Sequence, residues 1–259
     1  MDLGLRGRVV LVCGATGDLG AAVAGVLADE GAVLAVTGRS AESVAALGAH
    51  GFVCDLADTS QTERLVADVE STVGPIHGVV NTVGPIRHPP QGPQLYADDD
   101  IWDHHFQQVL MPVVRVCRAV VPLMKERGCG SIVNISATSA RHYYPRMASY
   151  AAMKAAVSHV TKAYARDAAP AGVRVNALHP GWINQDRTKE MVRSLAADRG
   201  VSEQAVVADL MREKSDDMYY TKRFGEPDEY AQVIAFLLSD QAGYVAGARI
   251  AVDGGSPTA

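Results

Sequence analysis

Tyr150 and Lys154 are the residues whose types and spacing most clearly suggest chemistry. They lie four positions apart in the segment SYAAMK, and residues at this spacing share one face of a helix. A phenol has a pKa of about 10, and a neighbouring ammonium lowers that pKa by stabilising the phenolate. We therefore expect the pair to donate a proton to a carbonyl that is being reduced, or to accept one from an alcohol. The alternative is a pair on a solvent-exposed helix surface.

A glycine-rich turn near the amino terminus predicts a site for phosphate groups. Gly14, Gly17 and Gly20 follow an apolar run and precede an amphipathic stretch. At such a turn one glycine permits a tight bend, another admits the backbone to a pyrophosphate, and the third allows helix and strand to pack closely. The helix amino terminus then faces the negative charge. We expect the turn to contribute these cofactor-binding residues: Gly14, Thr16, Gly17, Asp18, Leu19 and Gly20.

The end of the second apolar run indicates which nicotinamide cofactor is preferred. The segment from Thr37 to Ser40 contains no carboxylate to accept a hydrogen bond from a ribose hydroxyl. Arg39, next to Gly38, can instead pair with a 2′-phosphate in a bidentate manner. We therefore expect NADP(H) to be favoured over NAD(H), with Arg39 as a solvated loop arginine being the alternative.

Short apolar runs alternate with amphipathic stretches along the whole chain, which is typical of a parallel sheet covered by helices. The predicted fold class is α/β: a Rossmann-type, doubly wound parallel sheet of about seven strands with helices on both faces. We expect strands at 8–13, 32–37, 52–54, 78–81, 131–135, 173–178 and 249–252, and helices at 19–29, 59–73, 102–126, 149–169 and 227–239.

Two segments interrupt this alternation. Residues 85–100 contain four prolines and are expected to form a loop. Residues 182–224 are longer than a connection in a compact α/β domain needs and include a polar helix candidate near 202–214. We expect residues 1–259 to form one dinucleotide-binding catalytic domain, with a substrate lid at about 182–224.

Composition excludes several classes of protein. Hydrophobic residues make up 48% of the 259 residues, which excludes a disordered chain, and the net charge of −5 argues against nonspecific binding of nucleic acid. No basic segment followed by an apolar stretch opens the chain, and no apolar run is long enough to cross a bilayer, so we expect no membrane association and a cytoplasmic location. His104 and His105 are adjacent and cannot face one metal on a helix, so no metal site is expected. The four cysteines, which we expect to be reduced, are Cys13, Cys54, Cys117 and Cys129.

Taken together, these motifs resemble the short-chain dehydrogenase/reductase family, and in particular its ketoacyl-reductase-like members. The resemblance extends from Arg8 to Gly255. Besides the glycine turn and the Tyr150/Lys154 pair, it rests on the segments CDL at 54–56, NTVG at 81–84, SIVNIS at 131–136, VRVN at 173–176, HPG at 179–181 and VDGG at 252–255.

The resemblance implies hydride transfer between the cofactor and a ketone or secondary alcohol. Tyr150 would be the acid/base, and Lys154 would hold the nicotinamide ribose and lower the pKa of Tyr150. A homodimer or homotetramer built on the helices at 102–126 and 149–169 is also implied. Further cofactor contacts would come from Asp55, Leu56, Asn81, Val83, Gly84, Pro180, Gly181 and Ile183.

Several positions depart from the family pattern. Ala137 stands where the family has its substrate-orienting serine, which leaves Ser136, Thr138 or Ser139 to supply the hydroxyl; we place Ser136 in the catalytic set. Val109 stands where the family has the asparagine that holds a proton-relay water. The remaining departures are Cys13 and Asp18 in the glycine turn, Thr82 in the NTVG segment, and Gln185 in place of a threonine after Pro180 and Gly181.

These departures keep two alternatives open. The replacements at Ala137 and Val109 are compatible with a cofactor-binding protein that has lost catalysis and serves as a regulator or scaffold. A lyase or epimerase that uses the same Tyr–Lys pair is the other alternative. Trp182, Tyr143 and Tyr144 suggest a bulky or cyclic substrate, with His142 beside them.

Overall fold

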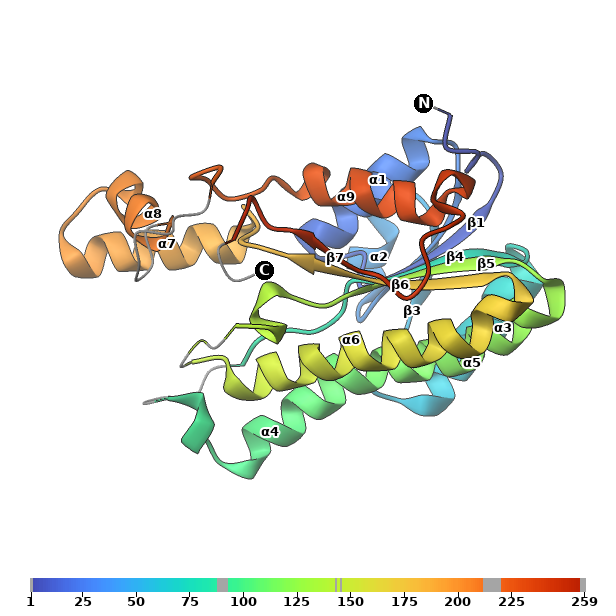
Figure 1. Cartoon of the computed structure of the whole chain (residues 1–259), viewed down its shortest axis with the longest axis horizontal. Coiled ribbons are helices and arrows are strands. Elements are labelled where there is room, and N and C mark those ends of the chain that lie inside the picture. Colours follow the sequence, from blue (N-terminus) through green and yellow to red (C-terminus); the bar gives the residue numbers. More distant parts are fainter. Residues whose placement is uncertain (1, 88–92, 143, 145, 212–219, 257–259) are drawn as a thin grey trace.

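A seven-stranded, all-parallel sheet forms the centre of the computed structural model, which describes residues 2–87, 93–142, 144, 146–211 and 220–256 (Figure 1). The strand order is β3-β2-β1-β4-β5-β6-β7. This order reverses between β1 and β4, which is the doubly wound arrangement that the sequence predicts. The strands are β1 (Val9–Cys13), β2 (Val33–Gly38), β3 (His50–Val53), β4 (Ile76–Asn81), β5 (Gly130–Ile135), β6 (Val173–Pro180) and β7 (Arg249–Val252).

The central strands are continuous apolar runs because both of their faces are covered. Every residue of β1 is buried, and β5 is buried except at Gly130. The edge strands β3 and β7 instead contain exposed residues. Strands buried on both faces read as unbroken hydrophobic segments rather than as alternating ones. This is why the sequence locates the middle of the sheet well.

Helices cover both faces of the sheet in two layers (Figure 1). Helices α1 and α9 pack on each other over one face, and α3, α5 and α6 pack over the other. Each layer encloses its own buried apolar cluster. The helices are α1 (Asp18–Asp29), α2 (Ala41–Ala45), α3 (Thr59–Thr72), α4 (Asp99–His105), α5 (Met111–Arg127), α6 (Ala148–Ala168), α7 (Asp186–Arg199), α8 (Glu203–Met211) and α9 (Pro227–Leu238).

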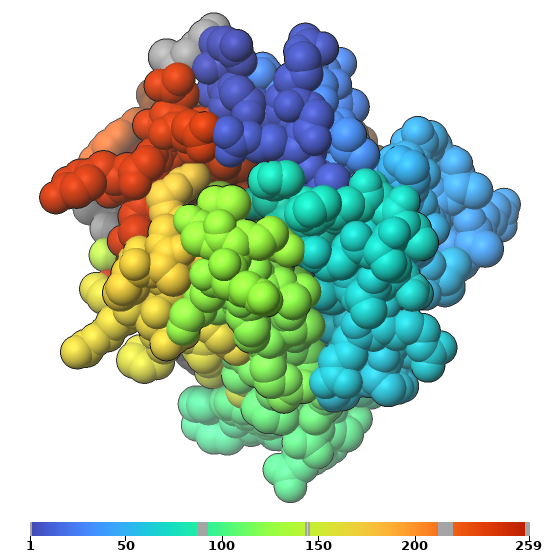
Figure 2. Space-filling view, turned by 90° about the vertical axis from the view of Figure 1, so that its right-hand side faces the viewer, coloured from blue at the N-terminus to red at the C-terminus, as the bar shows by residue number. Residues whose placement is uncertain are grey.

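Different parts of the chain lie at the two ends of the sheet. Figure 1 shows α7 and α8 extending beyond the carboxyl ends of the strands. The opposite end, which faces the viewer in Figure 2, brings the amino-terminal segment and the carboxyl-terminal third of the chain together. There Arg8, at the start of the chain, forms an ion pair with Asp240. The amino-terminal segment and the loop that follows α9 therefore close the end of the sheet that lies away from the pocket.

Several elements differ from those that the sequence predicts. The expected helix at 102–126 is interrupted at Phe106–Leu110 by a turn of π-helix between α4 and α5. Helix α7, which the periodicity did not predict, fills the first part of the expected lid. The polar helix candidate near 202–214 is present as α8, and its residues 212–214 lie outside the described part of the chain.

Among the described residues, the segment Asp99–Arg127 is the one helix that is long and apolar enough to cross a membrane by length and composition alone. The sequence contains no unbroken apolar run of that length. In α5 the buried residues face the sheet and α6, among them Val113, Val116 and Val120. A helix that packs against a sheet acquires such a face for that reason.

Candidate active site

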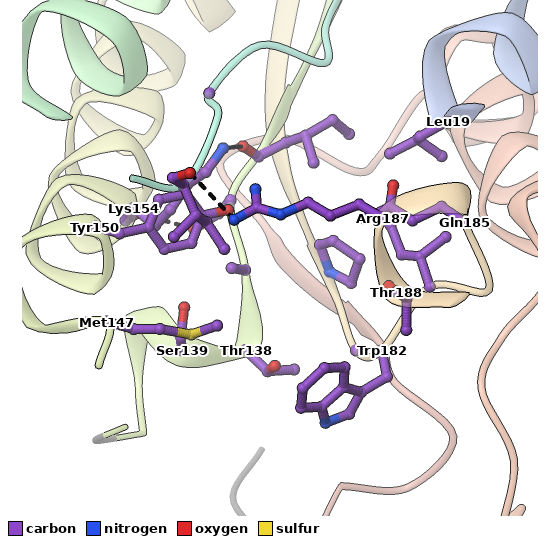
Figure 3. Close-up of a pocket in the computed structure, with 18 of the residues that line it drawn as sticks. Leu19, Thr138, Ser139, Met147, Tyr150, Lys154, Trp182, Gln185, Arg187 and Thr188 are labelled. Carbon is purple, nitrogen blue, oxygen red and sulfur yellow. Dashed lines mark hydrogen bonds between the residues drawn. The ribbon is translucent and has the colours of Figure 1, made fainter. Parts of the chain in front are cut away.

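A cavity of about 380 Å³ opens at the carboxyl edge of the sheet. In open α/β sheets this edge, near the reversal of strand order, is where ligands bind. Residues from the ends of β4, β5 and β6 and from α6 and α7 line the cavity (Figure 3). It brings together nine residues that the sequence predicts for the site: Leu19, Val83, Gly84, Ser136, Tyr150, Lys154, Pro180, Gly181 and Ile183.

Tyr150 and Lys154 line this cavity from one face of α6. The Lys154 side chain is buried, and its Nζ donates hydrogen bonds to the carbonyl oxygens of Val83 at 3.1 Å and Ile135 at 2.7 Å. Its Nζ lies 5.6 Å from the centroid of the Tyr150 ring. Since both carbonyls belong to the ends of the sheet, the backbone of β4 and β5 holds the amine in place.

Burial shifts the pKa values of this pair in opposite directions. It raises the pKa of Tyr150 to about 12, because the phenolate would lose its hydration, and the nearby charge of Arg187 lowers that pKa in part. Burial lowers the pKa of Lys154 to about 7. Arg187 thus joins Lys154 as a cationic group beside Tyr150, and the expectation that Lys154 lowers the Tyr150 pKa stays a prediction. A phenol with a raised pKa keeps its proton until a substrate oxygen takes it.

The amino terminus of α6 is held by side chains from the loop and helix that precede it. The Gln94 Oε1 atom accepts hydrogen bonds from the backbone N–H of Ser149 at 3.0 Å and of Tyr150 at 3.3 Å. His105 Nδ1 lies 2.9 Å from the Ser149 hydroxyl, and His105 Nε2 accepts a bond from the Arg87 N–H at 3.0 Å. The first N–H groups of a helix have no partner within it. Gln94 supplies that partner from a distant part of the chain.

The glycine turn has the shape of a phosphate cradle. Gly14 has a φ of +81°, and a Cβ on Gly20 would stand 2.3 Å from the Gly14 carbonyl oxygen, so both positions require glycine. A Cβ on Gly17 would meet nothing closer than 3.9 Å. Open space above Gly17, at the start of α1, leaves the backbone accessible to a ligand. These residues therefore fit the pyrophosphate of a dinucleotide.

Asp18 occupies the first turn of α1 and contacts the start of α7. Its Oδ2 atom accepts a hydrogen bond from the Asp186 N–H at 3.3 Å. A carboxylate at a helix amino terminus is stabilised by the helix dipole. Asp18 therefore joins the glycine turn to the first turn of α7, which explains an acidic residue that the sequence pattern left unexplained.

The other predicted cofactor residues follow the carboxyl ends of β1 to β4. Arg39 and Asp55 are exposed there, and the Asp55 Oδ1 accepts a bond from the Ala57 N–H at 2.9 Å. Asn81 is different, because its amide is buried and donates to Asn134 Oδ1 at 2.8 Å. The remaining predicted cofactor residues at this edge are Gly38, Leu56 and Thr16. Gly38 lies close to Thr16, since a Cβ on Gly38 would be 2.5 Å from the Thr16 methyl group.

Ser136, Thr138 and Ser139 lie in different surroundings. The Ser136 hydroxyl is turned inward, where it bonds to the Lys154 carbonyl oxygen and to the Ser158 hydroxyl, both at 2.8 Å. Ser139 also lines the cavity, and its buried Oγ finds no hydrogen-bond partner within the described part of the chain. A buried hydroxyl without a partner is rare and costs free energy. The Ser136 hydroxyl is thus engaged internally, whereas Thr138 and Ser139 both line the cavity and the Ser139 hydroxyl lacks a partner among the described residues.

Val109 lies within the π-helical turn and is fully buried. A Cβ placed on Gly84 would lie 3.3 Å from Val109 Cγ1 and 3.0 Å from Lys154 Nζ. The side chain at this position is thus an apolar neighbour of the lysine. Turns of π-helix occur often at functional sites, and here the turn places Val109 in the protein interior close to Gly84.

Comparison with known proteins identifies the family. The family model described as enoyl-(acyl carrier protein) reductase matches residues 14–256. The 3-oxoacyl-[acyl-carrier-protein] reductase FabG of Thermotoga maritima is 33% identical over 260 residues, which cover 97% of this chain and 98% of that protein. The chain is a short-chain dehydrogenase/reductase. It is accordingly an NAD(P)-dependent oxidoreductase.

Other short-chain dehydrogenases/reductases share its length and fold. The 2,3-dihydro-2,3-dihydroxybenzoate dehydrogenase of Bacillus subtilis is 31% identical, with 98% of this chain and 97% of that protein covered. The crystal structure of L-sorbose reductase from Gluconobacter frateurii, complexed with NADPH and L-sorbose, superposes with a TM-score of 0.89 at 27% identity and covers 100% of both chains. Levodione reductase superposes with a TM-score of 0.88 at 29% identity, with 97% of this chain and 98% of that chain covered.

Several residues of this short-chain dehydrogenase/reductase line the cavity without a sequence signal that predicted them. Arg187 and Thr188 come from α7, and Met147 precedes α6. The cavity lining also includes three residues that the sequence analysis singled out: Gln185 at the family's threonine position, Trp182 and Tyr144. Tyr143 lies outside the described residues. No periodicity marks such positions, because they are set by where α7 docks.

Proposed function

We propose that this enzyme transfers hydride between NADP(H) and a ketone or secondary alcohol, with Tyr150 as the acid/base. The observation that carries the proposal is the convergence of Tyr150 and Lys154 on one cavity at the carboxyl edge of the sheet. In the direction of reduction, the bound nicotinamide supplies a hydride to the carbonyl carbon. The carbonyl oxygen takes the Tyr150 proton, and the phenolate regains a proton from solvent.

Lys154 holds the ribose of the cofactor and sets the charge beside Tyr150 in this proposal. Its amine is fixed by two backbone carbonyls, so it presents its remaining donor or lone pair at one place. Its pKa of about 7 allows both charge states near neutral pH. An ammonium there stabilises the Tyr150 phenolate as the proton leaves.

Ser139 orients the substrate oxygen in this proposal, in place of the Ser136 that the sequence favours. The Ser136 hydroxyl already bonds to the Lys154 carbonyl oxygen and to Ser158. The Ser139 hydroxyl is buried, lines the cavity and has no partner among the described residues. Binding of a carbonyl oxygen would satisfy this hydroxyl and remove its desolvation cost.

The preference for NADP(H) rests on Arg39. This arginine follows β2 in an exposed position, and the segment from Thr37 to Ser40 contains no carboxylate. Replacing Arg39 by Gln removes a bidentate partner for a 2′-phosphate. We expect the ratio of KM for NADPH to KM for NADH to rise about 10- to 100-fold. An unchanged ratio would contradict the preference.

The substrate is proposed to be a small molecule with a carbonyl or hydroxyl group. L-Sorbose reductase and levodione reductase, by their names, act on carbonyl compounds. A cavity of about 380 Å³ suits a ligand of a few to a dozen heavy atoms rather than a macromolecule.

Incubation with NADPH and a panel of ketones tests the reaction. Loss of the near-ultraviolet absorbance of NADPH with formation of the alcohol supports it. Tyr150→Phe should abolish turnover while NADPH still binds, as measured by fluorescence titration. Tight NADPH binding without oxidation across the panel would favour the regulatory or scaffold alternative, to which Ala137 and Val109 point. Product formation without net cofactor consumption would indicate a lyase or epimerase.

A homodimer or homotetramer built on α5 and α6 is also proposed. Phe106, Leu95 and Tyr96 are exposed large apolar residues near the start of this helix layer. Such residues favour contact with another protein surface. Light scattering after size exclusion tests this, since a species of 27.4 kDa would contradict it.

A further inference from the structure

Arg187 is a cationic side chain in the cavity that the reaction proposed above leaves without a role. It projects from the first turn of α7 and reaches across the cavity, where one of its Nη atoms donates to the Ile86 carbonyl oxygen at 3.1 Å (Figure 3). Its guanidinium lies beside Tyr150 and Lys154 in this view, while Leu19, at the start of α1, lies on the opposite side. Arg187 is thus directed toward the reacting groups and away from the glycine turn.

The charge around Arg187 is unbalanced. Among the described residues, the cavity lining includes Arg187 and Lys154 but no Asp or Glu. Within the described part of the chain Arg187 forms no ion pair, although its neighbours on α7, Lys189 and Asp186, pair with each other at 3.6 Å. The protein as a whole carries a net charge of −5. A positive cavity in an acidic protein attracts anions to that one place.

The Arg187 guanidinium has more N–H donors than its hydrogen bond to Ile86 uses. It carries five N–H groups in a planar fork, and one backbone carbonyl uses a single Nη atom. That fork matches the two oxygens of a carboxylate, which lysine cannot match in the same way. The cavity that it enters is also lined by hydroxyl groups and apolar side chains, including Thr188, Trp182 and Met191.

We propose that Arg187 binds an anionic group on the substrate, so that the enzyme acts on ketones or secondary alcohols that also carry an acid group. The inference rests on the function proposed above and names the substrate class of the same site. The acid group replaces the Ile86 carbonyl as the partner of Arg187, and the ketone then lies between Arg187 and Tyr150. Arg187 is a specificity-determining residue, because it contacts the part of the substrate that does not react.

Oxo acids and their methyl esters test the proposal directly. We would measure kcat and KM with NADPH for pyruvate, acetoacetate and levulinate, in which the carboxylate lies at increasing distance from the ketone, and for the three esters. The wild-type enzyme should prefer at least one acid to its ester. Arg187→Gln should lower kcat/KM for that acid about 10- to 100-fold more than for its ester, mainly through KM.

Lys189→Gln is the matched control, because it removes the same charge from the same helix at a residue that does not line the cavity. It should leave the preference for the acid intact. An equal loss for acid and ester in Arg187→Gln would overturn the proposal. So would a tenfold loss of NADPH affinity with unchanged selectivity, since Arg187 would then serve the cofactor.

A measurement that needs no turnover separates this inference from the proposed reaction. With NADP⁺ present, the preferred oxo acid should raise the unfolding midpoint of the wild-type protein more than its methyl ester does. Arg187→Gln should lose that difference. If no ketone is reduced but the difference is found, the reaction fails and the anion site stands; if ketones are reduced without any such difference, the anion site fails alone.

Discussion

The α6 wall of the cavity and the α7–α8 segment that faces it are held in different ways. Lys154 on α6 bonds to backbone carbonyls at the ends of β4 and β5. Helices α7 and α8 instead pack around a separate small cluster of Val192, Ala196, Val206, Met211 and Phe224. Their described ion pairs are on the surface, as between Arg193 and Glu190, and surface pairs contribute little stability.

This difference teaches that chemistry and specificity are mechanically separated in the molecule. The groups proposed to move a proton depend on the sheet, which opens only when the protein unfolds. Arg187 and Thr188, which would select the substrate, belong to a segment with its own small core. Segments with few buried contacts open at lower free energy than the core does. Substitutions in the two regions should therefore have separable effects.

Lys154→Met should have the largest effect, because in the proposed reaction Lys154 holds the cofactor ribose and stabilises the Tyr150 phenolate. We expect turnover to fall by about two to four orders of magnitude. The variant should also differ in the pH dependence of stability. In the folded protein the amine has a pKa of about 7, against 10.5 as its ordinary value.

Between these two values the unfolded chain binds a proton that the folded protein does not. The free energy of unfolding of the wild type therefore rises with pH from about 7 upward, by up to about 1.4 kcal/mol per unit from this group. Chemical denaturation of wild type and Lys154→Met between pH 7 and 10 measures the difference. Parallel curves for the two proteins would show that the lysine is not desolvated, contrary to its burial.

Ser139→Ala is expected to have the next largest effect. Loss of a hydroxyl that bonds the substrate oxygen should lower kcat about 100-fold with little change in protein stability. Thr138→Val is the control, because Thr138 also lines the cavity. Restoring the family residue by Ala137→Ser in the Ser139→Ala background should recover part of the lost rate. Full activity of Ser139→Ala would assign the hydroxyl role elsewhere.

Gln94→Leu tests whether catalysis depends on the hydrogen bonds that Gln94 accepts at the amino terminus of α6. The backbone N–H groups of Ser149 and Tyr150 would lose their acceptor, at a cost of about 1–2 kcal/mol in the free energy of unfolding. We expect kcat to fall about tenfold, an effect on the order of one lost hydrogen bond, while KM for NADPH stays constant. Gln94→Glu keeps the acceptor and should retain more of kcat. A fall in stability with unchanged kcat would make the role of Gln94 purely structural.

Phe224→Ala should have the smallest effect on chemistry and the clearest effect on the α7–α8 segment. Phe224 stacks on Trp182 with ring centroids 5.7 Å apart. We expect faster hydrogen exchange in α7 and α8, unchanged exchange in β4 and β5, and a rise in KM for the ketone. Val120→Ala in α5 should instead lower the global free energy of unfolding, because Val120 is in the main core. A global loss of about 3–5 kcal/mol for Phe224→Ala would mean that the two regions unfold together.

The order of strands and helices was predictable because it depends on local patterns. The buried strands read as apolar runs, and α9 begins with Pro227, Asp228 and Glu229, whose types mark a helix start. The π-helical turn within the expected helix at 102–126 was not predictable from the sequence. Such a turn contains about one residue more than an α-helical turn, and this does not change how apolar the segment is.

The residues of the site also divide into those that local sequence predicts and those that it does not. Gly14 and Gly20 in the turn, and Tyr150 with Lys154 on one helical face, follow from spacing within a few residues of sequence. The sequence favours Ser136 over Ser139. Register along a strand does not show which of the two hydroxyls is already hydrogen-bonded inside the protein. That choice is made by Ser158 and the Lys154 carbonyl, which arrive from another element.

By itself the sequence determines the alternation of elements, the phosphate turn and the pairing of a phenol with an amine, since each is encoded by neighbours along the chain. Only the tertiary structure decides that Gln94 caps α6, that Ser139 keeps a free hydroxyl and that Arg187 spans the cavity. Those three features join segments from 55 to 101 positions apart or depend on what surrounds a buried atom. Hydrogen bonds and charges act across space, so no local pattern records them.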